Sequence, residues 1–238
     1  MKNIAIIIPT YNEFENIERL VKEIKKQVPK STIYIVDDSR KNDIGKLIFR
    51  KKIKAKYFHR GKKLGRGSAV IYGLKKAFSQ KKNSTFIEMD ADFSHEPKEL
   101  KKNINFFNKK NLDLLISSRY LNNSKIINWG LSRRIFSKLA NILARNLLRI
   151  NIQDFTNGYR IYSKKSVKKI IGKCGNIGDG FIILSEIIVV LHNNFYKIQE
   201  TRSTFVNRKR GESSVNLNLI LASFFGLIKL VFIKYRLK

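Results

Sequence analysis

Short apolar runs that end in polar residues alternate with helical stripes through the first half of the chain. Residues 4–8 form a β-branched run, typical of a strand buried on both faces, and Pro9 stops it. The next stripe has helical spacing and consists of Ile17, Leu20, Val21, Ile24 and Val28. Asn12 is placed to cap this helix, with Glu15 three residues later as in a capping box. The pattern predicts a strand, a short polar loop and a helix.

The same alternation continues along the chain. Further strands are predicted at residues 32–36, 56–59, 86–89 and 112–117. Helices are expected at residues 68–78 and from residue 98 onward. Strands that alternate with helices predict an α/β fold with a mostly parallel, doubly wound sheet and flanking helices. In such a sheet, ligands bind beyond the carboxyl ends of the strands.

Four polar motifs follow the predicted strands. They are residues 9–13, the Asp37-Asp38 pair, a loop with three glycines at residues 61–67, and residues 90–92. Because the strands are predicted to be parallel, these motifs should meet at one edge of the sheet. The sequence therefore places a candidate ligand site at that edge.

Asp90 and Asp92 are the most informative part of this edge. Two carboxylates spaced two residues apart are hard oxygen ligands that suit Mg²⁺ or Mn²⁺. Such a cation usually keeps several waters, and substrate phosphates complete its coordination. Taken alone, the same pattern also fits a solvated turn after a strand.

The composition of the chain limits the classes of protein to which it can belong. A chain of 238 residues fits one domain, or one domain with an appendage. Its single cysteine, Cys174, excludes an intramolecular disulfide and fits a reducing compartment. The first apolar run is too short for a signal peptide, so we expect none.

A formal charge of +31 calls for an anionic partner such as nucleic acid, an anionic membrane or a phosphorylated substrate, although it also fits lysine enrichment spread over solvated faces. We expect no nucleic-acid partner, because the basic residues are dispersed and no helix-turn-helix, zinc or RNA-binding motif is present.

The second half contains two amphipathic segments. Residues 131–150 place seven apolar side chains on one helical face: Leu131, Ile135, Leu139, Ile142, Leu143, Leu147 and Ile150. That helix either lies at a membrane interface or packs on the sheet with its basic side in solvent. Residues 217–233 are apolar apart from Asn218, Ser223 and Lys229. This run is shorter than the roughly 20 residues of a comfortable span, so we expect an interfacial or docking helix.

A nucleotide sugar would use most of the predicted edge. Asp38 would accept hydrogen bonds from the base or ribose, and Glu13 from ribose hydroxyls. Tyr11 offers a ring and a hydroxyl. The diphosphate would be neutralised by a cation on Asp92 with Asp90 nearby. Basic side chains for the phosphates are expected from later loops: Arg119, Arg202, Arg208, Lys209 and Arg210.

These motifs resemble those of family 2 glycosyltransferases with the GT-A fold, and most closely the dolichol-phosphate or polyprenol-phosphate mannosyltransferases. The matching segments occur in the order of the family: residues 9–13, 36–38, 63–67, 89–97, 118–120, 154–160 and 208–213. Together they cover roughly residues 4 to 230. Residues 93–97, Phe-Ser-His-Glu-Pro, are fairly specific to the polyprenyl-phosphate branch.

The resemblance implies a reaction: transfer of a hexose with inversion to the phosphate of a polyprenol or dolichol, mannose from GDP-mannose being the expected donor. It assigns nucleoside binding to Pro9, Tyr11, Glu13, Val36 and Asp38. Asp90, Ala91 and Asp92 would meet the sugar and the metal-bound diphosphate, and Arg119 and Arg208 would contact phosphates or sugar. Asp90, Asp92 and Arg119 are the expected catalytic residues. The acceptor is already an anion, so no strong general base is required.

The resemblance also implies an organisation and a location. We expect a catalytic domain at residues 1–212 and an apolar helix at residues 213–238 that attaches peripherally to the cytoplasmic face of a membrane. A membrane partner subunit is compatible with this arrangement. Two departures from the family pattern, the turn at residues 39–44 and Ser214 in place of a lysine, leave UDP-glucose as donor, or a saccharide as acceptor, as alternatives.

Overall fold

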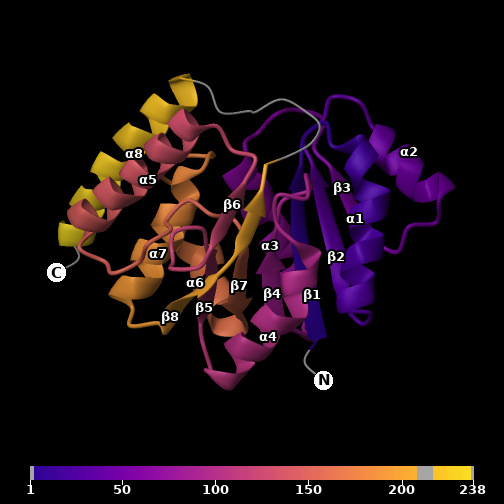
Figure 1. The fold of residues 1–238 in the computed structure, drawn as a ribbon. Coiled ribbons are helices and arrows are strands. Elements are labelled where there is room, and N and C mark those ends of the chain that lie inside the picture. The colour runs from indigo at the N-terminus through magenta and orange to yellow at the C-terminus, as the bar shows by residue number, and fades with distance from the viewer. Residues whose placement is uncertain (1–2, 208–216, 237–238) are drawn as a thin grey trace.

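The computed structural model describes residues 3–207 and 217–236 of the chain. Helices cover both faces of one large sheet (Figure 1). Its strands are β1 (Asn3–Thr10), β2 (Thr32–Asp37), β3 (Lys56–His59), β4 (Asn83–Glu88), β5 (Leu114–Ser118), β7 (Arg160–Ser163) and β8 (Ile198–Arg202). Their order across the sheet is β3-β2-β1-β4-β7-β5-β8, and only β7 pairs antiparallel with its neighbours. The predicted α/β fold with a mostly parallel sheet is confirmed.

The helices divide between the two faces of the sheet. They are α1 (Phe14–Gln27), α2 (Asp43–Arg50), α3 (Arg66–Phe78), α4 (Leu100–Lys109), α5 (Leu131–Leu148), α6 (Lys164–Lys173), α7 (Ile182–Asn193) and α8 (Leu217–Arg236), with a 3-10 turn η1 (Pro97–Glu99) before α4. Two short strands, β6 (Lys125–Ile127) and β9 (Thr204–Val206), pair separately. Alternate residues of β1 enter two cores: Ile7 joins α3, α6 and α7, while Ile6 joins α1, α2 and α4.

The predicted ligand edge is present. Strands β1, β2, β3 and β4 run parallel, so the loops at their carboxyl ends share one edge of the sheet. Strand β5 ends at the same edge, because it pairs antiparallel with β7, which pairs antiparallel with β4. This geometry brings residues 9–13, 37–38, 90–92 and Arg119 to one side of the molecule.

The predicted cap of the first helix is wrong. Helix α1 begins at Phe14, and its N-cap residue, Glu13, makes no side-chain capping hydrogen bond. Asn12 instead adopts a left-handed backbone conformation with φ 58°, and its backbone N–H donates to Ser39 Oγ at 2.9 Å. Asparagine tolerates this conformation better than most residues, so Asn12 forms the bend that ties the β1 loop to the β2 loop.

Helix α5 turns its apolar face outward. Leu131, Ile135 and Leu139 are 73%, 50% and 59% exposed, whereas Asn141 and Ala144 are buried against the body of the protein. The alternative in which the apolar stripe packs on the sheet is therefore wrong. The helix ends at Leu148, two residues earlier than predicted, because Arg149 is left-handed.

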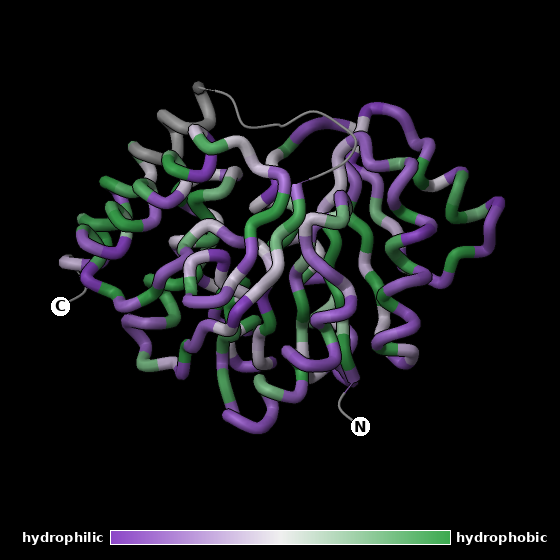
Figure 2. The backbone as a smooth tube through the Cα atoms, in the orientation of Figure 1, coloured by the Kyte–Doolittle hydropathy of each residue, from purple (hydrophilic) through white to green (hydrophobic). Residues whose placement is uncertain are grey.

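Helix α8 lies beside α5 on the outside of the molecule (Figure 1). Leu227 and Leu230 of α8 are buried in the same apolar cluster as α7, so the helix is anchored to the body of the protein. Figure 2 shows hydrophobic stretches along both helices. Among the described residues, no helix combines the length and apolar character that a membrane crossing requires. The predicted boundary at residues 212–213 lies outside the described residues.

Helix α3 approaches the sheet so closely that Gly73 has no room for a side chain. A Cβ there would stand 2.6 Å from Ile7 Cγ2 and 3.2 Å from Val36 Cγ2. We expect Gly73→Ala to lower the free energy of unfolding by about 1–3 kcal/mol, because overpacking forces backbone shifts. Gly172→Ala in α6 is the matched control, since nothing lies within 4 Å of its Cβ; helix propensity predicts a gain of up to about 1 kcal/mol. Urea denaturation of both variants tests this packing, and equal effects would contradict it.

Candidate active site

The residues predicted to hold the nucleoside begin at the loop after β1. Tyr11 is 38% exposed, with the Lys63 ammonium 4.8 Å from its ring centroid. Glu13 accepts a hydrogen bond from Asn16 Nδ2 at 2.6 Å. Pro9 and Val36 are buried and pair in register across β1 and β2. These two positions therefore offer a ligand their backbone rather than their side chains.

Asp38 is already engaged by an arginine. Arg60, just after β3, binds it in a bidentate manner: Nε donates to Oδ1 at 2.5 Å and Nη2 to Oδ2 at 2.8 Å. The backbone N–H of Leu64 also donates to Oδ2 at 2.9 Å. Asp38 is only 3% exposed. Through these hydrogen bonds, Asp38 holds the glycine loop at residues 61–67 against the end of β2.

Asp37 organises the altered turn that follows it. Its Oδ1 accepts hydrogen bonds from Thr10 Oγ1 at 3.1 Å and from the Ser39 backbone N–H at 2.9 Å. Its Oδ2 accepts from the Tyr57 hydroxyl at 2.8 Å. Burial of Tyr57, together with this bond to the carboxylate, raises the pKa of the phenol well above its ordinary value. The buried Asp37 carboxylate thus fixes the start of the turn at residues 39–44.

Two hollows lie beside this turn. The larger, of about 1120 Å³, lies between the start of α1 and α2, and the smaller, of about 230 Å³, adjoins Tyr11 and Ser39. The two share Asn12, Phe14 and Asp43 in their linings. The larger hollow does not include the Asp90–Asp92 loop.

Arg66 holds the start of the Asp90–Asp92 loop. Arg66 donates to Asp90 Oδ1 through Nε at 2.9 Å and Nη2 at 2.7 Å, and to Glu88 Oε1 through Nη1 at 2.6 Å. Burial disfavours the Arg66 cation, but the two carboxylates outweigh it and raise the pKa of Arg66. Glu88 is fully buried and also accepts from the Tyr162 hydroxyl at 2.7 Å.

His95 fixes the backbone of this loop. Its Nδ1 accepts a hydrogen bond from the Asp90 backbone N–H at 3.0 Å, so its Nε2–H is assigned as the donor to Asn157 Oδ1 at 2.8 Å. The ring is buried and stacks on Tyr159 with centroids 5.2 Å apart. Asp92 closes the loop, because its Oδ1 accepts from the Ser94 N–H at 3.0 Å.

The chemistry of the loop fits a divalent cation with only part of its ligands from the protein. Asp90 and Asp92 are half-buried, and Ser94 Oγ is buried with no hydrogen-bond partner among the described residues. The described part of the chain holds no cluster of three or more His, Cys, Asp or Glu side chains able to form a complete metal site. Carboxylate oxygens without a full protein cage suit Mg²⁺ or Mn²⁺, whose remaining ligands are water and substrate phosphates.

Arg119 is a buried, fixed cation. Its Nε donates to Asp154 Oδ2 at 2.8 Å and its Nη2 to Oδ1 at 2.7 Å. Burial alone would raise the pKa of Asp154, but the Arg119 charge and hydrogen bonds outweigh burial and lower that pKa. The guanidinium also lies 5.4 Å from the ring centroids of Trp129 and Phe205. Arg119 is 8% exposed, and its contact with phosphates or sugar stays a prediction.

The sequence reasoning missed the partners of the predicted residues. Arg60 and Arg66 both stand in the glycine loop region on the predicted edge, and this position was the available signal. Residues 154–160 were recognised only as a matching segment, yet Asp154 and Asn157 contact Arg119 and His95. Arg208, together with Ser214, lies outside the described residues.

Comparison with known proteins places this geometry in a family. Residues 5–171 match the family described as "Glycosyl transferase family 2". The chain is 32% identical over 228 residues to the protein named polyprenol monophosphomannose synthase of Mycolicibacterium smegmatis, covering 92% of this chain and 83% of the relative. It is 29% identical over 221 residues to the undecaprenyl-phosphate mannosyltransferase of Micrococcus luteus, covering 91% and 89%.

Solved structures share the fold. Glucosyl-3-phosphoglycerate synthase from Mycobacterium tuberculosis, in complex with Mn²⁺, uridine diphosphate and glucosyl-3-phosphoglycerate, matches with a TM-score of 0.69 at 14% identity. The match covers 98% of this chain and 80% of that one. The prediction of a glycosyltransferase of the polyprenol-phosphate branch is confirmed by the relatives, and the chain belongs to glycosyl transferase family 2.

Proposed function

We propose that this chain transfers mannose from GDP-mannose, with inversion, to the phosphate of a polyprenol. The observation that carries the proposal is the similarity over 92% of the chain to a polyprenol monophosphomannose synthase. The Asp90–Asp92 loop supports it, because a nucleotide sugar brings a diphosphate that needs a cation at such an edge. The apolar outer face of α5 also supports it, because the acceptor is a lipid.

Different residues of the edge would contact different parts of the donor. Tyr11 and Glu13 would contact the base or ribose together with the backbone at Pro9 and Val36, while Asp38 shapes the loop through Arg60. Asp90 and Ala91 would face the sugar. Arg119 would contribute a fixed positive charge held in place by Asp154, and Arg208 is a further proposed phosphate contact. The arrangement positions the donor with little reorganisation during transfer.

A polyprenyl phosphate acceptor would need no general base. A polyprenyl phosphate is an anion near neutral pH, so its oxygen can attack the sugar carbon without losing a proton. A Mg²⁺ or Mn²⁺ ion held by Asp92, with Asp90 nearby, would stabilise the charge on the departing nucleotide diphosphate. The chain then has two tasks, which are to hold the donor and to admit the acceptor phosphate in line with the bond that breaks.

Asp92→Asn removes the proposed cation ligand while keeping the side-chain shape. We expect transfer of labelled mannose from GDP-mannose to polyprenyl phosphate to fall about 100-fold or more, and chelation of Mg²⁺ and Mn²⁺ to abolish it in the parent protein. Glu23→Gln is the matched control, because Glu23 pairs with Lys26 on the surface of α1 away from the edge. Product formation is measured by extraction of labelled lipid.

The outcomes separate the alternatives. Transfer from UDP-glucose but not GDP-mannose would replace the donor and keep the acceptor. Transfer to a saccharide in place of the lipid phosphate would overturn the acceptor. Full activity of Asp92→Asn, or activity in chelator equal to that with metal, would overturn the role of the cation.

We also propose that α5 and α8 attach the protein peripherally to a membrane, on the cytoplasmic side. Their exposed apolar residues form what we term the α5–α8 apolar surface: Leu131, Ile135, Phe136, Leu139, Leu143, Leu147, Phe225, Ile228, Phe232, Ile233 and Tyr235. Tyr235 links the helices through a hydrogen bond from its hydroxyl to Leu147 O at 3.4 Å. Exposed Arg134, Lys138 and Lys229 add positive charge on the same helices, which favours anionic lipid headgroups. The single buried Cys174 agrees with a reducing compartment.

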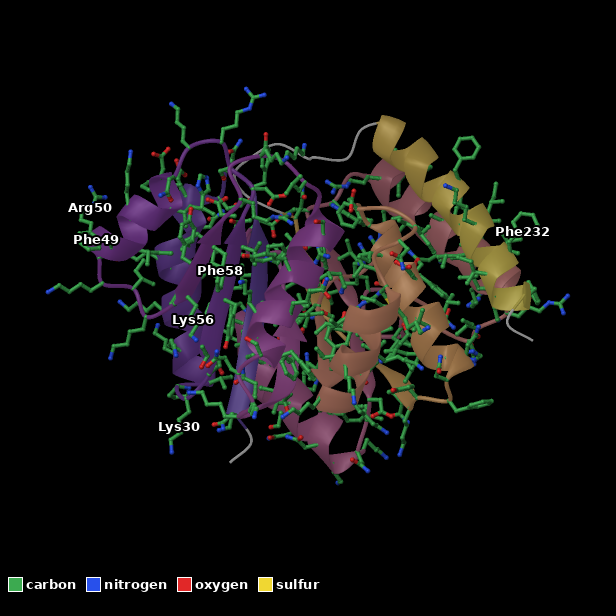
Figure 3. The ribbon with its side chains drawn as sticks, turned by 180° about the vertical axis from the view of Figure 1, so that it is seen from behind. Lys30, Phe49, Arg50, Lys56, Phe58 and Phe232 are labelled. Atoms are coloured by element: carbon green, nitrogen blue, oxygen red, sulfur yellow. The ribbon has the colours of Figure 1, made fainter. Side chains whose placement is uncertain are left out.

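Charged substitutions on this surface should release the protein from vesicles. We expect Leu139→Asp and Phe232→Asp each to weaken sedimentation with phosphatidylglycerol vesicles by at least about tenfold, because each replaces a proposed apolar contact with lipid by a charge. Phe49→Asp is the matched control. Phe49 is 88% exposed on α2, at the opposite end of the molecule from Phe232 (Figure 3).

Equal loss in all three variants would show that net charge, not this surface, drives binding. Sedimentation of the parent protein only after addition of a membrane extract would favour a partner subunit over direct lipid contact.

A further inference from the structure

A segment from the second half of the chain covers the start of α3. We term residues 174–181 the α6–α7 strap, because they join α6, which follows the reversed strand β7 and so ends at the ligand edge, to the start of α7. The Asp179 backbone carbonyl accepts hydrogen bonds from the Gly67 N–H at 2.8 Å and the Ser68 N–H at 3.3 Å. Both N–H groups belong to the first turn of α3, whose N-cap residue, Gly65, has no side chain to accept from them. The strap therefore caps α3 in place of a side chain.

The strap and the glycine loop fit so closely that side chains are excluded between them. A Cβ on Gly65 would stand 2.5 Å from the Asp179 carbonyl oxygen, and a Cβ on Gly67 would stand 2.6 Å from the Gly180 carbonyl oxygen. Gly65 also has φ 92°, a conformation that favours glycine. The partial positive charge at the start of α3 thus meets carbonyl oxygens of the strap. Two glycines of the loop are explained by this close approach.

The end of the strap also contacts the arginine that follows Gly65. The Phe181 ring centroid lies 5.7 Å from Arg66 Cζ, and Arg66 in turn donates to Asp90. From the other side, Arg60 Nη2 donates to the Gly65 carbonyl at 3.3 Å. The part of the glycine loop that the strap covers is therefore the part that connects the two arginines of the ligand edge.

Glu186 of α7 holds the beginning of the strap. Its side chain is buried, with the residue only 3% exposed, and its Oε2 accepts a hydrogen bond from the Gly175 N–H at 2.9 Å. The backbone N–H of Asn176 also donates to this carboxylate. Burial raises the pKa of Glu186 by more than these two hydrogen bonds lower it. One carboxylate thus fixes the first residues of the strap, while α3 is capped by its last residues.

We propose that Glu186 is a positioning residue of the donor site, which holds the α6–α7 strap in the conformation that caps α3 and fixes the glycine loop. The inference deepens the proposed function and rests on it, because the glycine loop borders the residues that we propose to hold the donor. Without the carboxylate, the N–H groups of Gly175 and Asn176 lose their acceptor and the strap relaxes. The donor then has to order the glycine loop as it binds, which weakens its binding more than it slows transfer.

Amide hydrogen exchange of Gly67 and Ser68 tests the contact directly, because both amides donate to the strap. We expect Glu186→Ala to speed their exchange by at least about tenfold. Asp113→Ala is the matched control: Asp113 is 4% exposed and accepts from the Lys197 backbone N–H at 3.0 Å, but it precedes β5 and so lies at the opposite edge of the sheet. This control also removes a buried carboxylate that binds backbone, and it should leave exchange at Gly67 and Ser68 unchanged. Nuclear magnetic resonance measures the exchange.

Steady-state transfer separates positioning from a loss of stability. We expect Glu186→Ala to raise the KM for GDP-mannose about fivefold to tenfold with little change in kcat, and Asp113→Ala to leave KM unchanged. A variant that only unfolds more easily loses active protein, so its apparent kcat falls while KM stays the same. Urea denaturation gives the stability of each variant. Glu186→Gln keeps one acceptor oxygen for Gly175, so exchange and KM should both shift in the same direction by about twofold to threefold; it replaces Glu186→Ala if that variant does not fold.

Unchanged exchange at Gly67 and Ser68 in the Glu186 variants would overturn the inference, and so would a fall in kcat with constant KM. Equal effects in Asp113→Ala would overturn it as well, because any buried carboxylate would then serve. Exchange needs neither donor nor lipid. If the parent protein makes no mannosyl lipid, the proposed function fails, while exchange and the calorimetric affinity of each variant for GDP and UDP still decide the role of Glu186.

Discussion

The ligand edge depends on buried arginine–carboxylate pairs. Arg60 holds Asp38, Arg66 holds Asp90 and Glu88, and Arg119 holds Asp154, each within 3 Å. Removing one partner of a buried pair leaves an uncompensated charge, which typically costs about 3–5 kcal/mol. The pairs thus fix the loops that extend beyond the ends of the strands. A nucleotide sugar meets a site whose charges already have fixed positions.

The antiparallel strand β7 links these pairs across the sheet. It lies between β4 and β5, so the loop that leads into it, residues 154–159, passes between the Asp90–Asp92 loop and Arg119. Asp154, Asn157 and Gly158 of that loop each contact a different part of the site. Fully buried Arg160 then donates to the Asn157, Leu184 and Phe155 carbonyls, which holds the loop itself in place. One reversed strand therefore connects the Asp90–Asp92 loop and Arg119 across the edge.

The features that could be predicted from the sequence are those that depend on local pattern, namely the strands and the edge that their ends share. The β-branched run at residues 4–8 is a strand because both of its faces are buried, and the polar ends of four parallel strands necessarily share an edge. Partnership between distant residues has no such pattern. Arg60 lies 22 residues from Asp38 and Arg66 lies 24 residues from Asp90, and no local pattern connects residues so far apart in the chain. The orientation of α5 was undecidable for a related reason, since a core face and a lipid face need the same apolar stripe.

The pairing also indicates where the excess positive charge lies. Arg60, Arg66 and Arg119 are each matched by carboxylates, so these pairs contribute little to the net charge of +31. The excess lies in lysines and arginines nearer the surface, where it acts at long range and is screened by salt. Such a field concentrates anionic substrates and anionic lipid surfaces near the protein without fixing their geometry. Surface charges thus attract anionic partners, whereas the buried pairs fix the geometry of the site. The loss of a single surface lysine should therefore weaken long-range attraction slightly, and the loss of Arg66 should disturb the geometry of the site.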